Sequence, residues 1–120
     1  MKQNYDPNNL SAEHCVPCEG GMLPIDKVSA EVLIKNIPDW ILYFPESTND
    51  NNGSIKREFK FKDFKTALEF TNKVGAIAEQ EDHHPDIELS WGKVGITLST
   101  HAIGGLSGND FILAAKIDTI

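Results

Sequence analysis

Two adjacent histidines, His83 and His84, lie in the acidic stretch EDHHPDI of this 120-residue chain. The unperturbed pKa of histidine is close to neutral pH, so imidazoles beside carboxylates can transfer protons, and they can also bind metal ions. A third histidine, His101, follows the next two alternating segments. The residue types and their spacing therefore indicate a proton-transfer site, a metal site, or a solvated polar loop.

A helix that ends just before the histidine pair is predicted over residues 63–81. Asp63 is a suitable N-cap, and the helix must end before Pro85 because the residue preceding a proline is disfavoured in the α region. His83 and His84 therefore lie at or just past its C-terminus. Its predicted apolar stripe consists of Phe64, Ala67, Leu68, Val74 and Ile77.

An antiparallel hairpin should carry His101 back to the histidine pair. Two segments alternate between apolar and polar residues, and their apolar positions are Ile87, Leu89, Trp91, Val94, Ile96 and Leu98. Gly92 and Lys93 form the turn between them. In an antiparallel pair the start of one strand lies beside the end of the next, so His101 is expected beside His83 and His84.

A metal site and a plain polar loop compete with proton transfer here. Three histidines and a carboxylate can hold zinc. Adjacent histidines point in different directions, however, and neither HExxH nor HxH occurs, so the motif for a metal site is weak. A histidine at a helix C-terminus, where a cation suits the helix dipole, would explain the cluster structurally.

The stretch HCVPC contains a lone CxxC, formed by Cys15 and Cys18. A zinc ribbon needs a second pair, and neither a βαβ context for a redox site nor the trailing histidine of a haem attachment site is present. The favoured interpretation is two small, reduced side chains that hold the leading segment in place. A metal site shared between subunits is the alternative.

The N-terminal part is predicted to be a loosely ordered segment over residues 1–21, followed by a single domain over residues 22–120. The domain begins with a helix for which Ser29 is the expected N-cap. Val32, Leu33 and Ile37 fall on one face of this helix, and Pro38 marks its end.

Two strands are expected next. The stretch WILYF, residues 40–44, is apolar throughout, which indicates a central or covered strand. Asn52-Gly53 is a hairpin turn signal. Residues 54–62 alternate as a half-buried strand, and Arg57 interrupts the apolar side, which suggests a sheet edge or a partner-facing position.

The last helix is predicted to start at Ser107, with Asp110 three residues later completing a capping box. The order is then helix, hairpin, helix, hairpin, helix (α-β-β-α-β-β-α). This order predicts an α+β domain in which a four-stranded antiparallel sheet carries three helices packed on one face.

Charge and hydropathy exclude several classes of function. The net charge is −7 and the isoelectric point is about 4.9, which argues against a nucleic-acid partner, because such proteins neutralise phosphates with lysine and arginine. No apolar stretch approaches the ~20 residues of a membrane span, and the N-terminus lacks a secretory signal. A cytoplasmic protein with no membrane partner is expected.

The spacing of the candidate site residues resembles the signature of the pterin-4a-carbinolamine dehydratase family. Glu79 is followed by His83-His84-Pro85, then by Trp91, His101 and Asp110, at the intervals of that signature. The segment VGITLSTHAIGGLSGNDFILAAKID is similar to the family's C-terminal half, and CVPCEGG is similar to the N-terminal part of many microbial and plant members.

The resemblance implies an α+β fold that assembles as a homotetramer and eliminates water from a 4a-hydroxy-tetrahydropterin without metal or other cofactor. His83 and His101 would form the acid/base pair, and His84 would orient the pterin or share the base role. Glu79 or Asp82 would fix an imidazole tautomer, while Asp110 has a lesser role because capping explains it equally well. The remaining supporting or substrate-binding positions are Pro85, Trp91, Ser99 and Thr100.

Three other functions remain compatible with the sequence. Some animal members of the family bind a transcription factor and stabilise its dimer, which would be a binding role. A second possibility is an enzyme of the same fold that acts on another pterin, for instance in molybdenum-cofactor metabolism. A zinc-binding module is the third.

Overall fold

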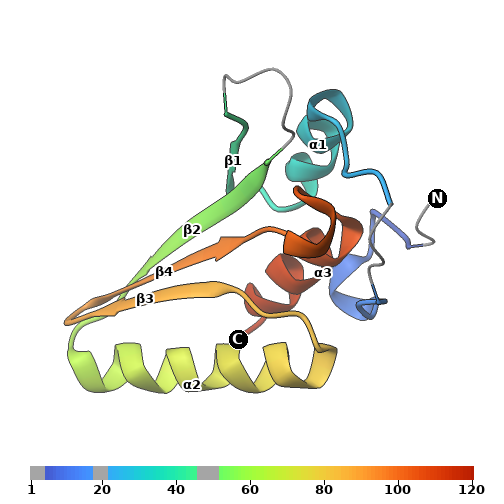
Figure 1. The fold of residues 1–120 in the computed structure, drawn as a ribbon. Coiled ribbons are helices and arrows are strands. Elements are labelled where there is room, and N and C mark those ends of the chain that lie inside the picture. Colours follow the sequence, from blue (N-terminus) through green and yellow to red (C-terminus); the bar gives the residue numbers. More distant parts are fainter. Residues whose placement is uncertain (1–4, 18–21, 46–51) are drawn as a thin grey trace.

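The computed structural model describes residues 5–17, 22–45 and 52–120 (Figure 1). The elements follow one another as η1 (Leu10–Ala12), α1 (Lys27–Leu33), η2 (Ile34–Asn36), β1 (Ile41–Tyr43), β2 (Ser54–Lys60), α2 (Phe64–Glu81), β3 (Asp86–Ser90), β4 (Lys93–Leu98), η3 (His101–Ile103) and α3 (Gly108–Ile117). The predicted α+β order is confirmed. Within the described part of the chain, no helix is both long and apolar enough to cross a membrane.

The four strands form one antiparallel sheet in the order β1-β2-β4-β3. The long strands β2 and β4 are paired from Ile55↔Leu98 to Lys60↔Lys93, and β3 pairs with β4 from Asp86↔Thr97 to Ser90↔Lys93. The β3–β4 hairpin therefore places the start of β3 beside the end of β4. This pairing determines which end of the sheet carries the histidines.

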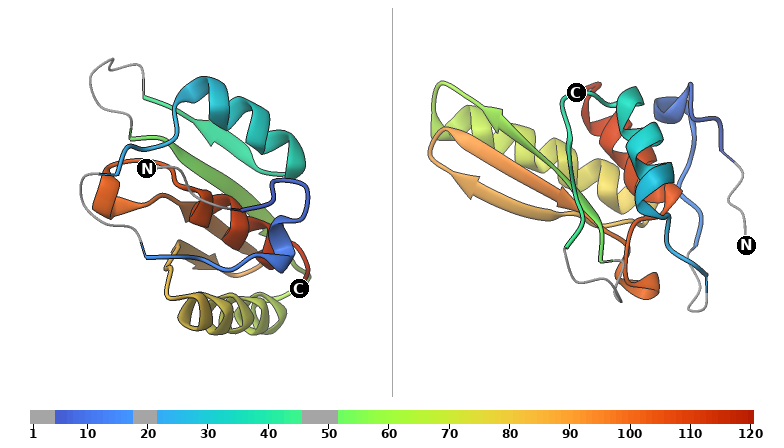
Figure 2. Two further views of the ribbon diagram at one scale, coloured as in Figure 1. Left: turned by 90° about the vertical axis from the view of Figure 1, so that its right-hand side faces the viewer. Right: turned by 90° about the horizontal axis from the view of Figure 1, so that it is seen from above.

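All three helices pack on the same face of the sheet. The inward side chains of the two central strands include Ile55, Val94, Ile96 and Leu98, each of them fully buried. They join buried residues of α1, α2 and α3 in one core, and α1, α3 and α2 follow one another across the sheet (Figure 2). The alternate residues of β2 and β3 are exposed, so the sheet has one covered and one open face.

The first helix starts earlier than predicted. Asp26, and not Ser29, is the N-cap, and its carboxylate accepts a hydrogen bond from the Ser29 N–H at 2.8 Å. Leu33 and Ile37 are buried as expected, but Val32 is 59% exposed. The change from α1 to the tighter η2 after Leu33 rotates the helix face, so Val32 and Ile37 do not share one side.

The WILYF stretch forms an edge strand and not a central one. Only residues 41–43 are in β1, which pairs with β2 alone, and Ile41 and Tyr43 are 71% and 60% exposed on the open face. Trp40 instead enters the core, with its indole N–H donating to Asp118 at 2.9 Å. An apolar run does not by itself distinguish an edge strand from a central one.

The β1–β2 hairpin is confirmed, although most of its connection lies outside the described residues. Asn52 adopts a left-handed backbone with φ of 34°, as a turn residue does. Gly53 approaches Phe44 closely, since a Cβ atom at this position would lie 2.8 Å from the ring. Asn52 and Gly53 lie directly before β2, and because residues 46–51 lie outside the described residues, the predicted turn stays a prediction.

The apolar stripe of α2 was predicted only in part. Asp63 is the N-cap, as expected, and its carboxylate accepts the Thr66 N–H at 2.8 Å. Ala67 and Val74 are buried, whereas Phe64 and Leu68 are 44% and 39% exposed. The stripe that packs on the sheet is Ala67, Phe70, Val74 and Ala78.

Arg57 lies on the interior strand β2, and not at an edge of the sheet. Its guanidinium lies 4.2 Å from the centre of the Phe59 ring and donates to Asp118 at 2.7 Å. Because Asp118 also accepts from Trp40, this cluster joins the C-terminus of α3 to the sheet.

The position of the core predicts the cost of truncating two isoleucines. We expect Ile55→Ala to lower the free energy of unfolding by about 2–5 kcal/mol, because Ile55 is fully buried. Ile41→Ala, the same change at a 71% exposed position, should alter it by no more than about 0.5 kcal/mol. Urea unfolding of both variants measures the difference, and equal losses would contradict the assigned core.

Candidate active site

The histidine pair lies where α2 ends and the chain turns toward β3. Asp82 caps the helix in the left-handed conformation, with φ of 52°, and the His83 N–H still donates to the Ala78 carbonyl at 3.2 Å. His83, His84 and Pro85 then lead into β3. The predicted helix end is confirmed, and the left-handed Asp82 redirects the chain so that His83 turns toward α3.

The hairpin brings His101 to the same place. It is the first residue of η3, directly after β4 and its following Ser99 and Thr100. A cavity of about 380 Å³ is lined by His83, His84, His101, Asp82, Ser99 and Thr100, among others. The convergence of the three histidines, predicted from antiparallel pairing, is therefore present in the structure.

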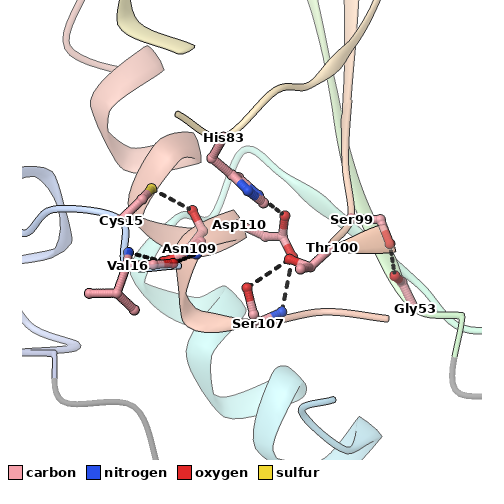
Figure 3. Close-up of polar contacts among 9 residues, drawn as sticks. All are labelled: Cys15, Val16, Gly53, His83, Ser99, Thr100, Ser107, Asn109 and Asp110. Atoms are coloured by element: carbon pink, nitrogen blue, oxygen red, sulfur yellow. Dashed lines mark hydrogen bonds and ion pairs between the residues drawn. The ribbon is translucent and has the colours of Figure 1, made fainter. Parts of the chain in front are cut away.

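His83 is held by a buried carboxylate. Its Nε2 lies 2.6 Å from Oδ1 of Asp110, which is fully buried, while the His83 side chain is 12% exposed (Figure 3). A carboxylate only accepts hydrogen bonds, so Nε2 carries the proton that is shared with Asp110. This leaves Nδ1 as the nitrogen able to accept or release a proton.

The second oxygen of Asp110 is occupied separately. Oδ2 accepts the Thr100 hydroxyl at 2.8 Å and the Ser107 N–H at 2.9 Å, which is the capping interaction predicted for α3. Because Thr100 donates its hydroxyl proton to Asp110, the Ser107 hydroxyl is the donor in the hydrogen bond to Thr100 Oγ1 at 2.7 Å. Capping the helix and holding His83 are therefore done by different oxygens, and the two explanations of Asp110 do not compete.

The other expected carboxylate partners take different places. Glu79 contacts His84 through its carboxylate, and both side chains are more than half exposed. Asp82 lines the cavity beside them. The sequence had suggested Glu79 or Asp82 as the group that fixes an imidazole; for the partly buried His83 that group is Asp110.

Three other predicted supporting positions, Ser99, Pro85 and Trp91, lie in different parts of the structure. Ser99 lines the cavity and donates its hydroxyl to the Gly53 carbonyl at 3.0 Å, which ties the end of β4 to the start of β2. Pro85 lies between the histidines and β3. Trp91 is in the β3–β4 turn at the opposite end of the strand from His84 and is 69% exposed, so this chain does not place it in the wall of the cavity.

The N-terminal segment reaches the site, which the sequence did not indicate. Glu81, whose side chain is 5% exposed, accepts the Cys15 N–H at 2.7 Å and lies 3.0 Å from Nδ1 of His14. Lys116 of α3 lies 3.9 Å from the same carboxylate. These contacts join residues far apart in the chain, and no local pattern marks them.

Residues 5–17 belong to the stretch expected to be loosely ordered, but they are packed along α3. Leu10 is 4% exposed, and Lys116 donates to the Ser11 carbonyl at 2.9 Å. Residues 1–4 and 18–21 lie outside the described part of the chain, and so does the second cysteine of the CxxC. The Cys15 thiol donates to the Asn109 carbonyl at 3.6 Å.

The electrostatics of Glu81 reflect opposing effects. Burial opposes its ionisation and by itself would raise its pKa. The hydrogen bonds from the Cys15 N–H and from His14, together with the charge of Lys116, outweigh burial, and the pKa of Glu81 is lowered from its ordinary value of 4.5. The carboxylate is therefore stabilised in its charged form by the folded structure.

A metal-binding cluster and a larger groove are the alternatives to the histidine cavity. Within residues 5–17, 22–45 and 52–120, no three or more His, Cys, Asp or Glu side chains are grouped so as to hold a metal ion. A larger groove of about 760 Å³ lies between α1 and the N-terminal segment, and it is lined mainly by apolar side chains such as Leu23, Val28 and Val32. Its aspartate, Asp26, is engaged in capping α1. The smaller histidine cavity is the one equipped for chemistry.

Over most of its length the chain is similar to members of one protein family. It matches the family model described as pterin 4 alpha carbinolamine dehydratase over residues 23–120. It is 45% identical over 112 residues to a protein of Halorhodospira halophila, covering 93% of this chain and 97% of the relative. It is 47% identical over 112 residues to a protein of Alkaliphilus metalliredigens, covering 92% of this chain and 95% of that relative. Both relatives carry the provisional name pterin-4-alpha-carbinolamine dehydratase.

Solved structures show the same fold. A crystal structure of a transcriptional coactivator/pterin dehydratase from Brucella melitensis superposes with a TM-score of 0.68 at 28% identity, covering 80% of this chain and 96% of that chain. A second structure is that of a pterin dehydratase-like protein identified as a RuBisCO assembly factor in the alpha-carboxysome. It superposes with a TM-score of 0.55 at 20% identity, covering 68% of this chain and 87% of that chain. The second likeness concerns the fold alone.

The lowered pKa of Glu81 predicts how its contribution depends on pH. A group whose pKa is depressed by folding stabilises the protein above its unfolded pKa, here about 4.5, and that stabilisation is lost as the pH falls through the folded pKa. The melting temperature of the wild type should exceed that of Glu81→Gln at about pH 5.5, and the gap should shrink toward about pH 3.5. Thermal melts across this range measure it, and a gap that widens with acid would contradict the assignment.

Proposed function

The chain belongs to the pterin-4-alpha-carbinolamine dehydratase family, as the spacing of its signature predicted, and we propose that it eliminates water from a 4a-hydroxy-tetrahydropterin by histidine acid/base catalysis. The observation that carries this proposal is the buried Asp110–His83 pair at a cavity that His101 and His84 also line. Family membership supplies the class of substrate, and the cavity supplies groups suited to the reaction.

The reaction needs two proton transfers. The C4a hydroxyl leaves as water only after it gains a proton, and the N5–H bond must break so that its electrons can form the C4a=N5 double bond of the quinonoid dihydropterin. The proton lost from N5 balances the one gained by the hydroxyl. One acid and one base near neutral pH suffice, and positioned groups of this kind contribute typically ~10²–10⁴-fold each.

In this scheme His83 is the better positioned of the two catalytic histidines. Asp110 holds Nε2–H and thereby leaves Nδ1 to exchange a proton with the substrate. The negative charge of Asp110 also stabilises the imidazolium that forms when Nδ1 takes a proton. Thr100 and Ser107 keep the carboxylate in place, so Asp110 acts as a positioning residue and not as a catalytic one.

His101 is assigned the complementary proton transfer. It is exposed at the start of η3, on the β4 side of the cavity, whereas His83 approaches from the α2 side. A substrate between them would have one imidazole toward the leaving hydroxyl and the other toward N5. His84, which contacts the exposed Glu79, would orient the pterin or share the role of base.

The biological setting is part of the proposal. A dehydratase of this kind would recycle the pterin used by aromatic amino acid hydroxylases, in the cytoplasm, as a homo-oligomer of two or four subunits. The exposed Phe64 and Leu68 on α2 and Trp91 in the β3–β4 turn are apolar groups that such an assembly would cover. An enzyme acting on another pterin, such as one of molybdenum-cofactor metabolism, would use the same histidines.

A binding role is the second candidate. The Brucella melitensis structure is described as both a transcriptional coactivator and a pterin dehydratase, and it is 28% identical to this chain. A partner helix would need an apolar surface, which the exposed side chains of α2 offer. Dehydration of a pterin by the purified protein, without a partner, distinguishes the two functions.

Removal of either catalytic histidine should slow dehydration. The carbinolamine is generated by an aromatic amino acid hydroxylase, and the quinonoid dihydropterin is followed by absorbance. We expect His83→Ala and His101→Ala each to lower kcat by about 10²-fold or more, with wild-type activity unaffected by a chelator. Wild-type turnover by both variants would refute the assigned roles, and loss of wild-type activity on chelation would favour a metal site.

Asp110→Asn should separate capping from catalysis. The asparagine oxygen can still accept the Ser107 N–H, so the N-terminus of α3 stays capped, while the negative charge facing His83 is lost. We expect kcat to fall by about tenfold or more and its pH profile to change, with a folded protein by circular dichroism. Thr100→Val, which removes one donor to the carboxylate, should have a smaller effect. An unchanged kcat and pH profile in Asp110→Asn would exclude the positioning role.

A further inference from the structure

A short segment near the N-terminus forms part of the histidine cavity. Residues 14–17, called here the strap, precede the matched residues 23–120. Val16 and Pro17 of the strap line the same cavity as the three histidines. The cavity wall therefore includes residues that precede the match to the family model, although the similarity to the two bacterial relatives extends across them.

The strap is anchored by two side chains that stand next to the site in sequence. Asn109 accepts the Val16 N–H at 2.9 Å and donates to the Val16 carbonyl at 2.5 Å, and it directly precedes Asp110. Figure 3 shows Asn109 between Val16 and Asp110. Asn109 is 3% exposed, so its amide is committed to these contacts in the interior.

The second anchor is Glu81, two residues before His83. Its buried carboxylate holds the Cys15 N–H and contacts His14. The backbone of Cys15 is thus attached to Glu81, and the backbone of Val16 to Asn109. These two residues lie within two positions of His83 and Asp110 in the sequence. Because of these attachments, a movement of the strap also moves the side of the cavity that carries His83 and Asp110.

The strap contributes the apolar part of a mainly polar cavity. Among the described residues that line it, the histidines, Asp82, Ser99, Thr100 and Asn109 are polar, and Ala102 is the one apolar residue outside the strap. A pterin ring is flat, with polar atoms on its edge and apolar faces. Such a ligand needs an apolar surface against one face while its edge meets hydrogen-bonding groups.

We propose that the strap is the apolar wall on which the pterin ring packs, and that Glu81 and Asn109 are positioning residues that hold this wall. The inference rests on the proposed function, and it assigns substrate affinity to a segment that precedes the match to the family model. In this arrangement, contact with the strap determines KM for the carbinolamine, and proton transfer by the histidines determines kcat.

The first test compares matched truncations. Val16→Ala should raise KM for the carbinolamine by about threefold to tenfold and keep kcat within about twofold, because apolar contact is lost and the histidines are intact. Val32→Ala is the control: it removes the same atoms from a similarly exposed valine, 59% against 46%, in the other groove. It should leave both constants unchanged.

The second test varies the anchor. Glu81→Ala removes the acceptor of the Cys15 N–H and should raise KM by about tenfold, whereas Glu81→Gln keeps an oxygen at that position and should recover most of the affinity. Circular dichroism and thermal melts establish that each variant is folded at the assay temperature. Asn109→Ala should resemble Glu81→Ala, because it removes both hydrogen bonds to Val16.

A binding measurement separates this inference from the proposed function. Fluorescence titration with biopterin gives a Kd for each protein without turnover. A wild type that binds biopterin but does not accelerate dehydration would refute the proposed function, and weaker binding by Val16→Ala than by Val32→Ala would still support the strap. Equal KM and Kd values for the wild type and Val16→Ala, in an active wild type, would overturn the strap inference. Absence of both activity and biopterin binding would overturn both.

Discussion

The arrangement of the site depends on a single buried charge. The Asp110 carboxylate is fully buried, and an ionised group in the interior is tolerated only when its oxygens are paired with donors. The donors come from three places in the chain: the N-terminus of α3, Thr100 two residues after β4, and the His83 imidazole after α2. The position at the N-terminal end of a helix also favours negative charge. The three segments must therefore meet so that the Asp110 carboxylate receives its hydrogen bonds.

The sheet determines where they meet. Because β3 and β4 form a tight hairpin, the residues before β3 and after β4 share one end of the sheet, and the Trp91 turn lies at the other end. The helices cover one face only, so the histidine cavity lies at one end of a two-layer sandwich. Exposed aromatic and aliphatic groups on α2, β1 and the β3–β4 turn lie away from the cavity, whereas the exposed Val16 lines it.

The N-terminal segment forms a further wall of the cavity at this end of the sheet. It crosses α3 and is attached to Glu81, two residues before His83, and to Asn109, directly before Asp110. In the proposed division of labour, the family domain carries the proton-transfer groups and the segment before it supplies an apolar surface. A polar cavity with one apolar wall suits a flat heteroaromatic ligand better than either kind of surface alone.

The sequence by itself determined the element order, the hairpin pairing, the helix caps at Asp63 and Ser107, and the meeting of three histidines, because these follow from local periodicity and from antiparallel geometry. Only the tertiary structure decided that WILYF is an edge strand and that Trp91 lies far from the histidines. Only the tertiary structure showed that Asp110 holds His83, or that Glu81 anchors residues 14–17. Those contacts join residues separated by 27 and 66 positions, and they arise from how helices and loops pack on the sheet, which no local pattern encodes.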